Sequence, residues 1–277
     1  MKATKKIVGA ACALVAAVAL SAGSTFAWFS QSGTVSATGM NVKATTSKNL
    51  VISNSSTGTF GSSAASVNSA VMEMTPASTA DGASFFYVSN PEEVDYATGA
   101  ANNGAIFAAA TPTPVTSSMT TPVPAYYVME YSYWVKADAA AGTEYSTLYV
   151  SKIDVAQKVD GTTAAAEDIS KALRVSVTYG TNTFIYAPVT GATATYKGIV
   201  AAGTKGTDTV ESTADVAIKT AGTVGDNLGK VTTTAAEVKI HVWYEGQDTN
   251  CTSQNSIDVE ELSVAVSLTA AGASSGS

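Results

Sequence analysis

The chain has 277 residues, a formal net charge of −7 and only 13% charged residues. The excess of acidic over basic groups argues against binding to nucleic acid or to anionic lipid, because clusters of Lys and Arg hold both. The dominance of Ala, Thr, Ser, Gly and Val is unlike a helical cytosolic enzyme and favours strands and turns.

The N-terminus predicts export. Three Lys residues precede an apolar stretch that ends at Leu20, and the small residues Thr25 and Ala27 occupy the two positions that a signal peptidase inspects. The apolar stretch is shorter than the roughly 20 residues that span a bilayer. We therefore expect a signal peptide over residues 1–27, cleavage between Ala27 and Trp28, and a secreted or cell-surface protein without a stable membrane anchor.

The mature range 28–277 is expected to form a single β-sandwich domain. The signal peptide holds three of the 15 basic residues and none of the 22 acidic ones, so the mature net charge is 12 − 22 = −10. Cys12 is removed with the signal peptide, which leaves Cys251 alone and excludes an internal disulfide. Whether Cys251 links two subunits is left open. A chain of this length can bury a sufficient core without disulfides.

Period-two alternation of apolar and polar residues predicts the strands. In chain order, the expected strands cover residues 39–53, 69–75, 84–89, 127–136, 147–157, 173–179, 183–189, 194–200, 238–245 and 262–268. Each strand has one apolar face. This pattern predicts an all-β fold with two packed antiparallel sheets in a β-sandwich.

The segments between the strands predict long loops and at most one short helix. Four prolines between residues 111 and 124 exclude a central strand and indicate an extended connection. A helix is expected at about residues 164–172, where Glu167 and Asp168 lie in the first turn. The Gly- and Thr-rich stretch 201–230 is expected to be a long loop or a mobile hairpin.

The residue inventory argues against an enzyme. His241 is the only histidine and Cys251 the only mature cysteine, so a zinc site lacks its usual ligands. The two could form a thiol nucleophile and its base, but alternation places His241 on the solvent face of its strand and Cys251 in the following turn. We predict no catalytic residue, no metal site and no cofactor.

Adjacent acidic residues provide the basis for a hydrolase, the third-ranked function. A glycosidase needs two carboxyl groups to converge across one site, whereas adjacent acids on solvated segments are common. The acidic pairs are Glu92 with Glu93, Glu167 with Asp168, and Glu260 with Glu261. The segment 245–250 carries oxygen ligands that calcium prefers, but it lacks the spacing of an EF-hand, and a turn is the favoured interpretation.

Two tryptophans suggest a second class of function. Trp134 and Trp243 fall on the polar faces of their strands, and an exposed aromatic ring can stack on a sugar. A secreted monomeric module that binds a glycan or a host molecule is therefore the alternative function. The competing interpretation is that a second layer of the protein covers the rings.

The export junction resembles that of the TasA and camelysin family, secreted proteins of Gram-positive bacteria. The resemblance rests on Ala22-Gly23-Ser24-Thr25-Phe26-Ala27-Trp28-Phe29-Ser30 and on Val35-Ser36-Ala37-Thr38-Gly39-Met40-Asn41-Val42. It implies a jelly-roll sandwich, export through a dedicated signal peptidase, and a homopolymer in the form of a surface or biofilm-matrix fibre.

The mature N-terminus is the expected polymerisation segment. Burial of Trp28 and Phe29 would contribute on the order of 2–3 kcal/mol each. Residues 28–38 can add as a donor strand to a sheet edge of a neighbouring subunit, with Trp28, Phe29 and Val35 as the inserted side chains. Such head-to-tail addition generates an open filament. A disordered or self-docked terminus is the competing interpretation.

Overall fold

The all-β prediction is confirmed in a computed structural model. It describes residues 35–38, 41–47, 49–66, 71–90, 104–115, 123–139, 143–159, 162–164, 168–192, 195–248, 250–251 and 261–275. Within these ranges the only α-helix is α2 (Asp168–Lys171). No helix of the described residues is long and apolar enough to cross a membrane.

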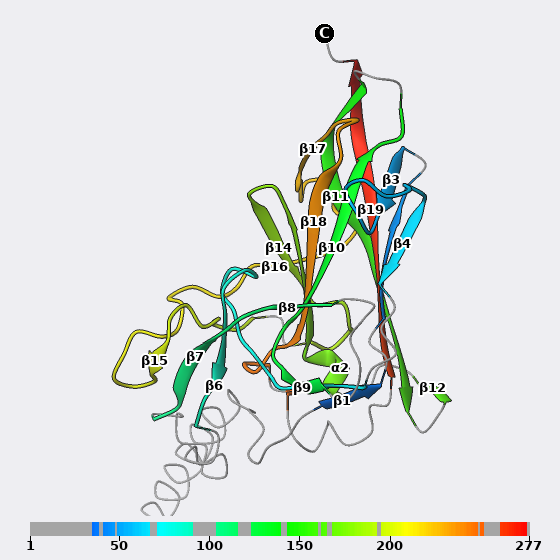
Figure 1. Cartoon of the computed structure of the whole chain (residues 1–277). Helices are drawn as coiled ribbons and strands as arrows, with labels where there is room; N and C mark the ends of the chain where they lie inside the picture. Colours follow the sequence, from blue (N-terminus) through cyan, green and yellow to red (C-terminus); the bar gives the residue numbers. More distant parts are fainter. Residues whose placement is uncertain are drawn as a thin grey trace, which may run out of the picture.

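The first of the two larger sheets has seven strands (Figure 1). Its order is β16-β14-β13-β18-β10-β3, and β8 pairs with β10. The bounds are β16 (Ile218–Lys219), β14 (Asn182–Tyr186), β13 (Leu173–Tyr179), β18 (Ala236–Tyr244), β10 (Met129–Ala137), β3 (Leu50–Ser53) and β8 (Thr113–Pro114). The central strands β13, β18 and β10 are those in which alternation was clearest, and they run antiparallel.

The second larger sheet has six strands in the order β12-β11-β19-β2-β4, and β17 pairs with β11. The bounds are β12 (Thr162–Ala164), β11 (Thr143–Val159), β19 (Glu261–Ser275), β2 (Asn41–Thr46), β4 (Ser63–Ser66) and β17 (Gly229–Val231). Strands β11 and β19 are paired along nearly their whole length. Strand β2 joins β19 in parallel, and β8 and β16 join the first sheet in parallel, so both larger sheets are mixed and the prediction of purely antiparallel sheets was wrong.

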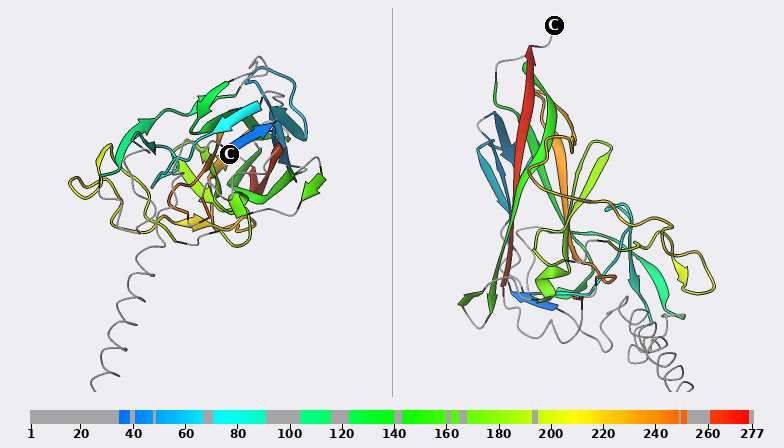
Figure 2. Two further views of the ribbon diagram at one scale, coloured as in Figure 1. Left: turned by 90° about the horizontal axis from the view of Figure 1, so that it is seen from below. Right: turned by 180° about the vertical axis from the view of Figure 1, so that it is seen from behind.

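Two three-stranded sheets accompany the larger ones. The first contains β1 (Val35–Thr38), β5 (Val71–Met74) and β9 (Val123–Tyr126), in the order β1-β5-β9. The second contains β15 (Gly203–Thr204), β7 (Ile106–Ala110) and β6 (Phe85–Val88), in the order β15-β7-β6. Strand β1 lies at the end of the molecule opposite the C-terminus, and β6, β7 and β15 project to one side (Figures 1 and 2).

The main hydrophobic core contains the apolar faces of both larger sheets. Tyr131 and Tyr133 of β10 contribute to it from the first sheet, and Val264 and Val266 of β19 from the second. The hydroxyl of Tyr133 donates a hydrogen bond of 2.8 Å to the main-chain oxygen of Val42, which satisfies a buried polar group across the core. The period-two pattern thus identified the apolar faces correctly.

A second apolar cluster lies against the opposite face of the seven-stranded sheet. We call the segments 76–88 and 195–218 the covering layer. Phe85 and Tyr196 of the covering layer pack in one cluster with Trp243 and Ile185 of the sheet. The ring of Phe85 meets that of Trp243 edge-on, with centroids 5.1 Å apart. The central strands of this sheet are therefore covered on both faces.

Four predicted elements differ from the structure. The expected strand 39–53 is divided into β2 and β3, which belong to different sheets. In the described part of the helix expected at residues 164–172, α2 covers only Asp168–Lys171, and residue 164 ends strand β12. The expected strand 194–200 forms one isolated bridge, at Ile199, in its described part 195–200. The expected loop 201–230 contains β15 and β16. Very short strands carry too few residues for a periodic pattern, so packing against a neighbour decides them.

Candidate functional site

The outward face of the seven-stranded sheet carries polar residues in register. Ser176 of β13 pairs with His241 of β18, and His241 pairs with Glu130 of β10. Arg174 and Trp243 form the next row on this face, because alternate residues of a strand point to the same side. These side chains lie beneath the covering layer, and together they are the candidate site.

The His241 row is a continuous set of hydrogen bonds. His241 Nδ1 lies 3.2 Å from Ser176 Oγ, and His241 Nε2 lies 3.0 Å from Glu130 Oε2. The Ser176 hydroxyl lies 2.8 Å from the main-chain oxygen of Gly82 in the covering layer. His241 is only 5% exposed. Burial lowers its pKa from the usual 6.5, against the opposing effect of Glu130.

A serine, an imidazole and a carboxylate in one row have the composition of a nucleophile, a general base and an orienting acid. A nucleophile must be reached by its substrate, and Ser176 has no exposed surface. Gly82 closes the site so tightly that a Cβ built on it would lie 3.0 Å from Ser176 Cβ. In the described geometry Ser176, His241 and Glu130 therefore hold the covering layer to the sheet, and Ser176 is not placed to attack a substrate.

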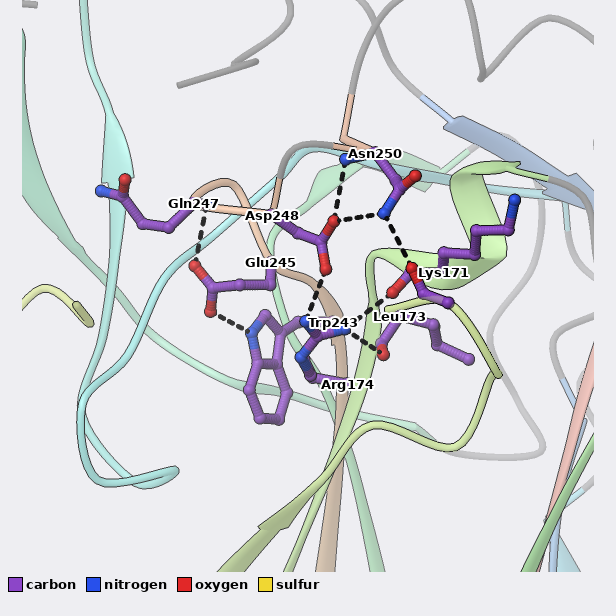
Figure 3. Close-up of polar contacts among 9 residues, drawn as sticks. Lys171, Leu173, Arg174, Trp243, Glu245, Gln247, Asp248 and Asn250 are labelled. Carbon is purple, nitrogen blue, oxygen red and sulfur yellow. Dashed lines mark hydrogen bonds and ion pairs between the residues drawn. The ribbon is translucent and has the colours of Figure 1, made fainter. Parts of the chain in front are cut away.

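A buried ion pair joins the start of β13 to the turn after β18 (Figure 3). Arg174 Nη2 donates to Asp248 Oδ2 at 2.5 Å, and neither side chain has exposed surface. Arg174 Nη1 also donates to the main-chain oxygens of Lys171 and Leu173, at 2.8 and 3.0 Å. The guanidinium thereby fastens the end of α2, the first residue of β13 and the turn to one another.

Glu245 is a second fully buried acid in the same turn. Its carboxylate accepts hydrogen bonds from Trp243 Nε1 at 3.1 Å and from the main-chain nitrogen of Gln247 at 3.0 Å (Figure 3). Ser78 of the covering layer also donates to it. Burial nevertheless dominates and raises the pKa of Glu245 to about 7. This carboxyl group therefore changes its charge near neutral pH while it joins the covering layer to the sheet.

Cys251 is also buried. Its main-chain nitrogen donates to the oxygen of Asp248 at 2.9 Å, and its side chain packs in the main core. Burial, with Glu245 and Asp248 nearby, raises the pKa of the thiol well above its ordinary value. His241 lies on the other face of the sheet, so the two residues do not form the thiol and base that the sequence left open. A fully buried, protonated thiol is a poor group for a link between subunits.

Within the described residues, no group of three or more His, Cys, Asp or Glu side chains could hold a metal ion. In the segment 245–250, Glu245 is engaged by Trp243 and Asp248 by Arg174, as expected of a structural turn. No protein-family model matches this chain, and no curated protein and no solved structure is significantly similar to it.

The placement of His241 on a solvent face was wrong. Alternation identified the correct face of β18, but the covering layer buries it, and it also buries Trp243 completely. Trp243 therefore cannot stack on a sugar, whereas Trp134 is half-buried. Sequence reasoning also missed the pairing of Arg174 with Asp248. The two residues are 74 positions apart, and no local pattern links them.

Several predicted residues lie outside the described part of the chain. They belong to the export junction and to the acidic pairs: Ala27, Trp28, Phe29, Glu92, Glu93, Glu167 and Glu260. Val35 is the first residue of β1, where it is paired with Met74 of β5. The end of the proposed donor segment thus lies in a strand that pairs within its own chain.

Proposed function

We propose that this chain is an exported structural protein, the subunit of a surface or biofilm-matrix fibre of the kind formed by the TasA and camelysin family. In this proposal residues 28–38 of one subunit add as a strand to the next. The observation that carries the proposal is β1. It is an edge strand of a small sheet and is paired with β5 along all four of its residues.

The pairing of β1 with β5 is made by the main chain, so an identical segment from a neighbour can make the same pairing. Such an exchange of equal elements is the basis of domain swapping, and it needs no new recognition chemistry. The remaining N-terminal residues, Trp28 and Phe29, would add the free energy of burying two aromatic rings. Repeated head-to-tail exchange does not close on itself and gives an open filament.

The arrangement of the larger sheets supports the finer fold assignment in the proposal, a jelly-roll β-sandwich. Their apolar faces share one core, and the polar residues of the outward face are closed beneath the covering layer. A protein in which the described candidate residues Ser176, His241 and Cys251 are buried, and which has long paired strands, suits a load-bearing role. Strands β11 and β19 supply such a pair.

Electron microscopy of the secreted protein tests the fibre directly. We expect filaments from the parent chain and folded monomers from a variant with Trp28→Ser and Phe29→Ser. A matched control, Gln31→Ala with Ser32→Ala, changes two residues of the same segment without removing an aromatic ring and should still form filaments. Filaments of undiminished length from the aromatic variant would rule the mechanism out.

A designed disulfide tests whether β1 leaves its own chain. Val35 and Met74 are direct partners across an antiparallel pair, where Cα atoms lie about 4.5–5.5 Å apart, within the range of a disulfide. The variant Val35→Cys with Met74→Cys should stay monomeric when oxidised and elongate after reduction. When it is oxidised after assembly, the new disulfide should join different subunits on a non-reducing gel. Elongation of the oxidised monomer would exclude exchange of β1.

A further inference from the structure

The hydroxyl of Ser176 faces two acceptors but has one hydrogen. Its oxygen lies 2.8 Å from the main-chain oxygen of Gly82 and 3.2 Å from His241 Nδ1. A serine hydroxyl donates one hydrogen bond, and a carbonyl oxygen can only accept. The Gly82 carbonyl therefore receives the Ser176 hydrogen only when Nδ1 does not take it.

Glu130 determines which nitrogen of the neutral imidazole carries the hydrogen. Its carboxylate accepts only, and it lies 3.0 Å from Nε2, so Nε2 must be the donor. A neutral ring then leaves Nδ1 bare, and Nδ1 accepts the Ser176 hydrogen. In the imidazolium both nitrogens donate. The Gly82 carbonyl lies within hydrogen-bonding reach of the ring as well as of Ser176. Nδ1 then gives its hydrogen to Ser176 Oγ or directly to the Gly82 carbonyl, and the hydroxyl hydrogen is free to turn to the same carbonyl.

We propose that His241 is a proton-operated latch for the covering layer: a proton on its ring directs the Ser176 hydroxyl to Gly82 and fastens the turn 79–84 to the sheet, and loss of that proton removes the hydrogen bond. The latch rests on the relative positions of three side chains and one carbonyl, and it is independent of the proposed fibre. It regulates the attachment of one layer to another.

The turn 79–84 is built to move as a unit. The main-chain nitrogen of Gly82 donates to Thr79 Oγ1 at 2.9 Å. Asp81 Oδ1 accepts from the nitrogens of Ala83 and Ser84 at 2.8 and 2.7 Å. These bonds lie within the turn and do not attach it to the sheet. The Gly82 carbonyl reaches outward to Ser176, so the latch acts on the attachment and leaves the internal shape of the turn unchanged.

The groups around His241 set the pH at which the latch operates. Glu130 of β10 and the main-chain oxygen of Gly82 favour the charged form of the ring, while Lys239, on the same strand as His241, opposes it. Phe85 of the covering layer packs edge-on against the ring, with centroids 5.3 Å apart. The carboxylate of Asp81 is engaged within its own turn. Burial has the largest effect on the pKa of His241 and lowers it. We therefore expect the ring to gain its proton, and the latch to close, below pH 6.5.

Nuclear magnetic resonance of the secreted protein can follow both ends of the latch, because the chain contains one histidine. At pH values above the pKa of His241, the ring should be neutral and should carry its hydrogen on Nε2. On acidification, the carbonyl carbon shift of Gly82 should titrate with the same midpoint as the ring. The Gly82, Ala83 and Ser84 amides are bonded within the turn, so their exchange should stay unchanged and serves as the internal control.

Four substitutions separate the latch from a general effect of pH. Ser176→Ala should leave the ring titrating and reduce the response of Gly82 to the part that the ring transmits directly, and His241→Gln should abolish both. Glu130→Gln supplies an amide donor to Nε2, which allows the neutral ring to keep its hydrogen on Nδ1. Gly82 should then stay fastened at every pH. The control Lys239→Gln should shift the midpoint of both titrations together.

Three results would overturn the proposal. They are a neutral ring protonated at Nδ1 in the parent chain, a Gly82 carbonyl that does not follow the ring, and a Gly82 response of undiminished size in Ser176→Ala. Should Ser176→Ala fail to fold, the tautomer of the parent ring and the joint shift in Lys239→Gln still decide the question.

Discussion

Replacing Glu245 by Gln should remove a pH-dependent destabilisation of the folded protein. The pKa of this buried carboxyl is raised from 4.5 to about 7, mainly by burial. An acid whose pKa is higher in the folded than in the unfolded chain stabilises the fold through its protonated form. Its contribution is therefore fully present below pH 4.5, and it is lost as the pH rises through about 7.

The size of the effect follows from the two pKa values. Their difference is 7 − 4.5 = 2.5, and each unit corresponds to about 1.4 kcal/mol, so the full change is roughly 3 kcal/mol. Gln stays neutral at every pH and imitates the protonated acid. It has only one acceptor oxygen for the donors of Trp243 and Gln247, which costs about 1–3 kcal/mol independently of pH.

Urea unfolding followed by tryptophan fluorescence, from pH 5 to 8.5, measures this contribution. The free energy of unfolding of Glu245→Gln minus that of the parent should become more positive by roughly 3 kcal/mol across the range. Taking the difference cancels the opposite contribution of His241. Glu237→Gln, at an exposed position of the preceding strand β18, is the control and should change stability by less than about 0.5 kcal/mol. A difference that is flat or falls with pH would refute the reasoning.

Three further outcomes are expected from the packing around the site. Arg174→Met leaves Asp248 buried without its guanidinium and should cost about 3–5 kcal/mol in urea unfolding, whereas Arg174→Met with Asp248→Leu should cost clearly less than the sum of the two single changes. Gly198→Ala places a Cβ 2.1 Å from a main-chain oxygen and should cost about 1–3 kcal/mol or more, while Gly225→Ala, with open space around it, should be nearly neutral; equal effects would contradict the packing. Cys251 should resist a thiol reagent in the native protein and react after unfolding, and rapid native labelling would show that the thiol is not buried.

The strongest strands could be predicted because each carries enough residues for its period to be read. In β10, buried and half-buried positions alternate along all nine residues, so the apolar face was clear before any partner was known. Strand β19 alternates in the same way from Leu262 to Ala270, whereas β13 and β18 alternate in residue type but are buried on both faces. Strands of two residues, such as β15 and β16, contain no period at all, and their neighbours determine them.

Residue alternation predicted less about the candidate site than about the strands. Alternation placed Ser176, His241 and Trp243 on the outward face, and that assignment is correct. It could not show that the covering layer lies on that face. A segment about 150 positions before Trp243 supplies Phe85, which packs against it, and only the folded chain brings the two together.

The sequence by itself determined the dominance of strands and the two faces of the central ones, because both depend on short-range periodicity. It also determined that the chain has one histidine and two cysteines for chemistry. Only the tertiary structure decided that the charged pair Arg174 and Asp248 is buried and that His241 is closed beneath Gly82. Burial and long-range pairing depend on which distant segments pack together, and no local pattern of residues encodes that choice.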